Sequence, residues 1–129
     1  MQSGTMPEIE LQLTSDRKPR PAGEKLKFGR IFTDHMFVMD YEEGRGWHSP
    51  RIVPYQPITL EPSAMVFHYA QTVFEGLKAF RAADGRIRLF RPEMNVRRLN
   101  RSCARLSIPP VDERLALEAI RKLVETDRD

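Results

Sequence analysis

Apolar residues recur at three- and four-residue spacing in the last third of the chain. This spacing predicts a helix from about Pro92 to Arg105, with Arg97 and Arg101 on the opposite face. Pro109–Pro110 should end the helix, because a proline disfavours helical backbone in the residue before it. The residues expected to share its apolar face are Val96, Leu99, Cys103 and Leu106.

A second amphipathic helix is predicted directly after this proline pair. Asp112 is a suitable N-cap, because its short side chain can accept a hydrogen bond from the backbone of the first turn, where Glu113 stands. The buried face of this helix is expected to contain Leu117, Ile120, Leu123 and Val124.

Short apolar runs earlier in the chain predict strands. Leu77–Phe80 and Ile87–Phe90 are separated by a turn that contains Asp84-Gly85, a strong hairpin signal. Two more strands are expected around residues 37–39 and 52–53, joined by a loop at residues 44–46, and the nearby prolines Pro50 and Pro54 favour an edge position.

The first 27 residues are predicted to form an extended arm. They are mostly polar, and only Ile9, Leu11 and Leu13 alternate as a short strand would. The remaining residues, 28–129, combine strands, a hairpin and two helices, which indicates a small α+β domain with an incomplete sheet.

Composition excludes some classes of protein function and indicates a cellular location. The 21 Lys and Arg against 18 Asp and Glu leave a net charge of only +3, which is no polybasic signature for nucleic acid. A lone cysteine, Cys103, cannot form an internal disulfide, and the three histidines have no metal-binding spacing, so no metal is expected. The start has no apolar signal core, and no run approaches membrane-spanning length, so a cytoplasmic location is expected.

Two stretches carry candidate chemistry. Residues 68–76 mix aromatic and small residues just before the first hairpin strand, although residues such as His68, Tyr69 and Phe74, taken alone, are more often structural than functional. Several arginines crowd the first predicted helix. Arg98 lies at the border of the apolar face, where its stem can pack and its planar head can reach a phosphate, although a solvated helix face is the plain alternative.

Four segments of the chain occur in the order of a known family. From the N-terminus they are Phe28-Gly29 with residues 32–36, Trp47 with residues 50–52, His68–Arg81, and Ile87–Pro92 continuing through Asn95, Arg98, Leu99, Arg101 and Ser102. Together they resemble the branched-chain amino acid aminotransferases, which are fold-type IV (class IV) pyridoxal-phosphate enzymes with a fold like that of D-amino-acid aminotransferase. The resemblance covers roughly residues 28–124.

The resemblance implies roles for individual residues. Arg98, in an Arg-Leu-x-x-Ser pattern, is similar to the arginine that holds the phosphate of pyridoxal 5'-phosphate. Tyr69 and Phe74, with Phe28, would line the apolar pocket for a Leu, Ile or Val side chain. Related fold-type IV enzymes often have His where this chain has Asn95, which bears only on the subgroup.

The resemblance also implies what these residues do not supply. None of the five lysines matches the Schiff-base lysine of the family, which is expected beyond residue 129 in a second domain. Residues 28–129 would then be the small N-terminal domain, with no catalytic residue of their own and no activity alone. The intact enzyme is expected to be a homodimer in amino-acid biosynthesis that uses 2-oxoglutarate as amino acceptor.

Other interpretations remain open. A D-amino-acid aminotransferase or an aminodeoxychorismate lyase would share the arginine helix, but the run from Phe74 to Phe80 favours the branched-chain family. A non-catalytic binding module could use the same arginines on RNA or another acidic partner, although few aromatic residues alternate with them.

Overall fold

The chain is described by a computed structural model that covers residues 6–20 and 29–128, so Phe28 lies outside the described residues. These residues contain five strands and two helices. They divide into two compact units, one formed by residues 1–57 with 122–129 and the other by residues 58–121. The small α+β character predicted from the sequence is therefore confirmed.

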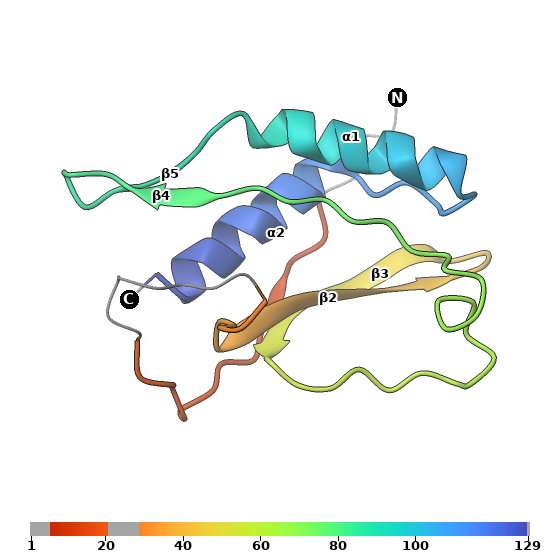
Figure 1. Cartoon of the computed structure of the whole chain (residues 1–129), viewed down its shortest axis with the longest axis horizontal. Coiled ribbons are helices and arrows are strands. Elements are labelled where there is room, and N and C mark those ends of the chain that lie inside the picture. The colour runs from red at the N-terminus through yellow and green to blue at the C-terminus, as the bar shows by residue number, and fades with distance from the viewer. Residues whose placement is uncertain (1–5, 21–28, 129) are drawn as a thin grey trace. The chain divides into compact units, whose positions relative to one another are not determined.

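The first unit is built on a three-stranded sheet in the order β1-β3-β2. The strands are β1 (Glu10–Leu11), β2 (His35–Glu42) and β3 (Gly46–Pro54), and the β2–β3 hairpin is seen in Figure 1. Phe37 pairs with Ile52 in an antiparallel register. Gly44 and Gly46 both have positive φ, a conformation that costs glycine little, and this allows the tight reversal. The predicted pair of strands is confirmed.

The predicted edge position of the proline-containing strand is wrong. β3 is the central strand, because β1 pairs with it in parallel at Arg51 and Ile52. This contact falls between Pro50 and Pro54, where the residues of β3 keep the backbone N–H groups that proline lacks. One hydrogen bond of the pairing runs from the Gln12 N–H to the carbonyl of Ile52 at 2.8 Å. A two-residue strand thus fits between the prolines.

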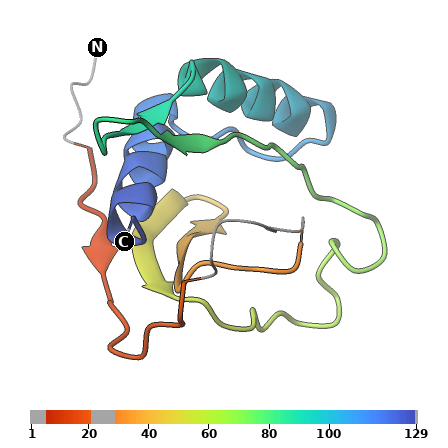
Figure 2. The same cartoon turned by 60° about the vertical axis from the view of Figure 1, so that its left-hand side comes forward.

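The second unit contains a β-hairpin and a helix that follows it. Strands β4 (Ala79–Arg81) and β5 (Ile87–Leu89) pair antiparallel, and the turn closes with Gly85 N–H donating to Ala82 O at 2.9 Å. Helix α1 (Pro92–Arg105) follows the hairpin (Figure 2). The proline stands at its first position. Both elements confirm the prediction from the sequence.

The apolar face of α1 is partly as predicted. Val96 and Cys103 are buried and Leu99 is half-buried, but Leu106 is exposed because the helix has already ended at Arg105. At the end of α1, the side-chain amide of Asn100 bonds both the N–H and the carbonyl of Val111, which fixes the connection to the next helix.

Helix α2 (Glu113–Thr126) begins where the sequence predicted it. The carboxylate of Asp112 accepts the backbone N–H of Leu115 at 2.8 Å, so the N-cap is confirmed. The predicted buried face is only partly right, because Leu117, Ile120, Leu123 and Val124 are half-buried while Leu115 and Ala119 are the buried residues. Ala119 is small and gives a weak apolar signal, which is why the pattern missed it.

Candidate functional site

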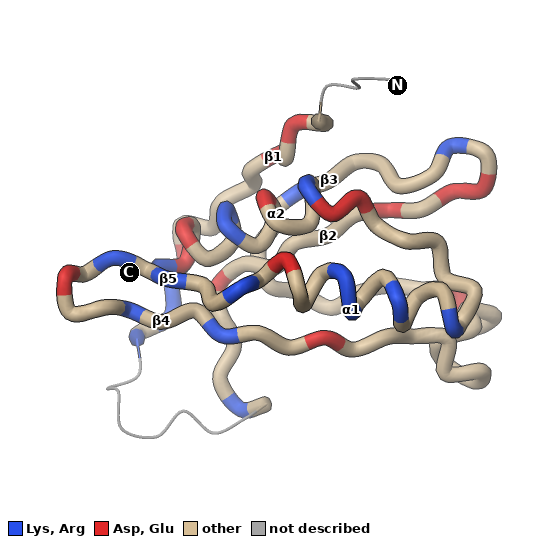
Figure 3. The backbone as a smooth tube through the Cα atoms, turned by 90° about the horizontal axis from the view of Figure 1, so that it is seen from above, with Lys and Arg blue, Asp and Glu red and all other residues tan. Residues whose placement is uncertain are grey.

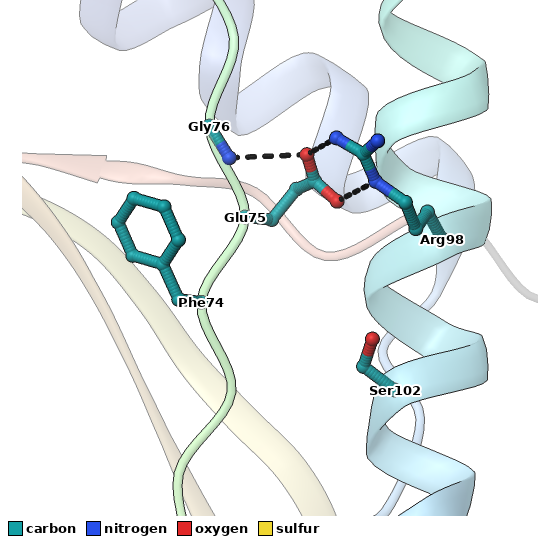
Figure 4. Close-up of a pocket in the computed structure, with 5 residues that line it drawn as sticks. All are labelled: Phe74, Glu75, Gly76, Arg98 and Ser102. Carbon is teal, nitrogen blue, oxygen red and sulfur yellow. Dashed lines mark hydrogen bonds and ion pairs between the residues drawn. The ribbon is translucent and has the colours of Figure 1, made fainter.

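An open hollow in the second unit brings together residues from two segments. Its lining residues are Phe74, Glu75, Gly76, Arg98 and Ser102, and its volume is about 360 Å³ (Figure 4). Arg98 and Ser102 lie one turn apart on α1, so their side chains project from the same face of the helix. The other three residues come from the extended segment before β4.

This extended segment runs alongside α1 in the opposite direction. The side-chain amide of Gln71 reaches the carbonyl of Leu106, just past the end of the helix, at 3.4 Å. Asn95, in the first turn of α1, donates through Nδ2 to the carbonyl of Gly76 at 2.9 Å. Contacts at both ends therefore hold residues 71–76 along the helix, and Glu75 lies beside its first two turns.

Arg98 and Glu75 form a two-pronged ion pair in the hollow. Nε of Arg98 donates to Oε2 of Glu75 at 2.7 Å, and Nη2 donates to Oε1 (Figure 4). The Glu75 side chain is only 10% exposed, whereas that of Arg98 is 60% exposed. The carboxylate is thus seated in the protein and the guanidinium reaches toward solvent.

Two further groups bind the same carboxylate. Asn95 Nδ2 and the backbone N–H of Gly76 each donate to Oε1 of Glu75 at 3.0 Å. The hydrogen bonds from Arg98, then Asn95 and Gly76, favour the charged form and lower the pKa of Glu75 to about 2. Glu75 in turn raises the pKa of Arg98, so both partners are charged at neutral pH.

The guanidinium of Arg98 retains donors for a second anion. Of its five N–H groups, Glu75 uses the one on Nε and one on Nη2, which leaves the edge formed by Nη1 and Nη2. Within residues 6–20 and 29–128, Nη1 makes no hydrogen bond, and Figure 4 shows it on the side away from Glu75. The Ser102 hydroxyl lines the same hollow. This arrangement can bind a phosphate or carboxylate.

Basic positions recur along α1, as Figure 3 shows. They do not all have the same surroundings. Arg97 pairs with Glu113 at 3.4 Å, outside the hollow, whereas Arg98 alone among the helix arginines lines it. The border position that the sequence assigned to Arg98 therefore distinguishes it from its neighbours.

Of the residues predicted to line the substrate pocket, one lines the hollow and another does not. Phe74 lines the hollow and is 81% exposed, so its ring is available for contact. Tyr69 is 74% exposed, packs edge-on against His68 at 5.1 Å and does not line the hollow. The roles of Tyr69, Phe74 and Phe28 in substrate binding stay predictions.

Three residues of the site received no role from the sequence. Glu75 and Asn95 were noticed only as parts of a family pattern, and Ser102 only as the end of the Arg-Leu-x-x-Ser motif. The sequence around a carboxylate in an extended segment does not indicate which distant arginine will bind it in the folded chain. The pattern could not reveal a contact between residues 23 positions apart.

Three other kinds of feature in the described residues bear on function: a metal cluster, a membrane-spanning helix and a reactive thiol. No group of three or more His, Cys, Asp or Glu in them could hold a metal ion. Neither described helix is long and apolar enough to cross a membrane. Cys103 is buried, and burial raises the pKa of its thiol, which disfavours the reactive thiolate.

Comparison with known proteins gives close relatives. The chain is 61% identical over 121 residues to Branched-chain-amino-acid transaminase 1 of Bacillus subtilis and 55% identical over 125 residues to Branched-chain-amino-acid aminotransferase 2 of the same organism. It is 44% identical over 124 residues to the mitochondrial branched-chain-amino-acid aminotransferase of Bos taurus. These alignments cover 94%, 97% and 95% of this chain, but 34%, 34% and 31% of the relatives. No family model matches the chain.

Proposed function

We propose, from its homology to the branched-chain-amino-acid aminotransferases, that this chain is the part of such an enzyme that binds the cofactor phosphate and borders the substrate. The chain spans about a third of the length of those relatives. The observation that carries the proposal is the position of Arg98 and Phe74 in one open hollow. The reaction would move the amino group of L-Leu, L-Ile or L-Val to 2-oxoglutarate.

The residues of the hollow fit a phosphate group. Arg98 offers an unused guanidinium edge with two parallel N–H donors, and Ser102 adds a hydroxyl on the same helix face. We therefore assign Arg98 to the phosphate of pyridoxal 5'-phosphate. When bound, this cofactor supplies the electron sink that stabilises negative charge on the Cα of the amino acid.

The exposed aromatic residues suit a branched aliphatic side chain. Phe74 stands next to Glu75 in the hollow, so its ring can border a substrate held near the cofactor. The ring of Tyr69 is also exposed, and the family resemblance assigns Tyr69 and Phe28 to the same substrate side chain as Phe74. An apolar wall selects Leu, Ile and Val by excluding water and charged side chains rather than by hydrogen bonding.

The rest of the proposal concerns the complete enzyme. From the family resemblance we place the Schiff-base lysine in the part of the enzyme that corresponds to the unmatched two thirds of the relatives, beyond residue 129, and we expect residues 1–129 alone not to transaminate. We also propose a fold-type IV architecture, a homodimer, a cytoplasmic location and a role in branched-chain amino-acid biosynthesis.

A hybrid enzyme tests this function. In the hybrid, this chain replaces the region of Bacillus subtilis transaminase 1 that it matches, and glutamate formation from 2-oxoglutarate is followed with L-Leu, L-Ile, L-Val or D-Ala. We expect activity on the three branched L-amino acids in the hybrid and none in the 129-residue chain.

Three outcomes would contradict the proposal. A folded hybrid that makes no glutamate, beside an active unmodified Bacillus subtilis enzyme, would show that this chain cannot perform the role. Preference for D-Ala would instead assign the chain to the D-amino-acid aminotransferases. Activity of the short chain alone would refute the placement of the lysine.

A further inference from the structure

We propose that Glu75 is the positioning residue of Arg98: its carboxylate fixes one edge of the guanidinium so that the opposite edge is presented to the cofactor phosphate. This inference rests on the function proposed above. It gives a role in that site to a residue whose carboxylate is bound by Arg98, Asn95 and Gly76.

Glu75 is held in place by groups other than Arg98. Asn95 and the backbone N–H of Gly76 both donate to Oε1, and Asn95 is itself tied to the carbonyl of Gly76. With 10% of its side chain exposed, the carboxylate has little room to turn toward solvent. The carboxylate therefore holds Arg98 at a fixed position. It differs in this from a mobile counter-ion, which an arriving phosphate would displace.

The pair leaves the guanidinium with one defined orientation. A long arginine side chain that is 60% exposed would otherwise sample many rotamers. Two hydrogen bonds on the Nε and Nη2 edge set both the position and the plane of the head group. A phosphate then meets the second edge already oriented, and less conformational entropy is lost when it binds.

Glu75 also has an opposing effect. Its negative charge, close to Arg98, reduces the attraction of the hollow for a phosphate dianion. The two effects predict opposite results for a variant that keeps the shape and removes the charge. If positioning dominates, Glu75→Gln weakens phosphate binding; if charge dominates, it strengthens it.

The experiment compares two charge-removing variants in the hybrid enzyme. Glu75→Gln removes one acceptor of the Arg98 pair, and Glu113→Gln makes the same change in the Arg97 pair outside the hollow. The affinities for pyridoxal 5'-phosphate and for pyridoxal, which lacks the phosphate, are measured from the change in cofactor absorbance.

We expect Glu75→Gln to weaken pyridoxal 5'-phosphate binding about tenfold, as for loss of a charge-assisted hydrogen bond, and to leave pyridoxal binding unchanged. Glu113→Gln should change neither. Equal or tighter binding of pyridoxal 5'-phosphate by Glu75→Gln would overturn the proposal. An equal loss for both ligands would do the same, since it indicates a general structural effect.

A second measurement on the 129-residue chain separates this inference from the proposed function. The NMR signal of the Arg98 Nε–H should be protected from solvent exchange in the unmodified chain and in Glu113→Gln, and lose that protection in Glu75→Gln. No protection in the unmodified chain would overturn the positioning role. If the hybrid binds no cofactor while the Nε–H is protected, the proposed function fails but the positioning of Arg98 by Glu75 stands.

Discussion

His35 shows how single side chains organise the interior of the first unit. Its ring is fully buried, its Nδ1 lies 2.7 Å from Oδ1 of Asp127, and its Nε2 accepts the backbone N–H of Thr14 at 3.0 Å. Because Nε2 is an acceptor, the ring proton of the neutral tautomer is on Nδ1 and is donated to Asp127. One ring thus ties the N-terminal segment, β2 and the residue after α2 together.

Asp127→Ala should lower the free energy of unfolding by about 1–3 kcal/mol. The substitution leaves two donors of His35 without an acceptor, namely the ring Nδ1 and the backbone N–H, which lies 3.0 Å from Oδ2 of Asp127. Asp16→Ala removes the same charge from an exposed position and serves as the control. Urea denaturation of both variants measures the difference; equal stabilities would mean that the buried contact contributes little.

Glu75→Gln should change the acid stability of the chain. The folded-state pKa of Glu75 is lowered to about 2 from an ordinary 4.5, so its pair with Arg98 stabilises the folded state fully above about pH 4.5. That stabilisation is lost as the pH falls from 4.5 toward 2. The difference in unfolding free energy between the unmodified chain and the variant should therefore shrink over this range, as thermal or urea unfolding at several pH values would measure. A difference independent of pH would argue against the ion pair.

At the scale of elements, the sequence predicted what depends on local chemistry. The bounds of α1, the cap at Asp112 and the Asp84-Gly85 turn all follow from interactions within a few residues, and all are confirmed. The central place of β3 was missed because the partner strand is 41 positions away, at Glu10, and only two residues long. Pairing over such a separation leaves no trace in the local pattern.

Asp112→Ala tests the cap of α2. Removing the acceptor of the Leu115 N–H should cost about 1 kcal/mol in unfolding free energy, and Asp112→Asn, which keeps an acceptor oxygen, should restore most of it. Differential scanning calorimetry of the two variants makes the comparison. An equal loss in both would attribute the effect to the negative charge near the helix start instead of the hydrogen bond.

At the scale of the whole molecule, the candidate site was only partly predictable. The amphipathic spacing of α1 placed Arg98 at the border of its apolar face, and in the structure Arg98 and Phe74 both line one hollow. The spacing carried no information about the segment that runs antiparallel to α1, so the role of Glu75 was invisible. Residue types indicate which chemistry is possible, whereas the path of the chain decides which residues meet.

The proposed function depends above all on which arginine of α1 holds the cofactor phosphate. In the hybrid enzyme, the dissociation constant for pyridoxal 5'-phosphate is measured for Arg98→Ala and, as control, for Arg97→Ala, which removes an arginine paired with Glu113 outside the hollow. We predict at least about tenfold weaker binding for Arg98→Ala and no change for Arg97→Ala. Equal affinities in the two variants would contradict this prediction.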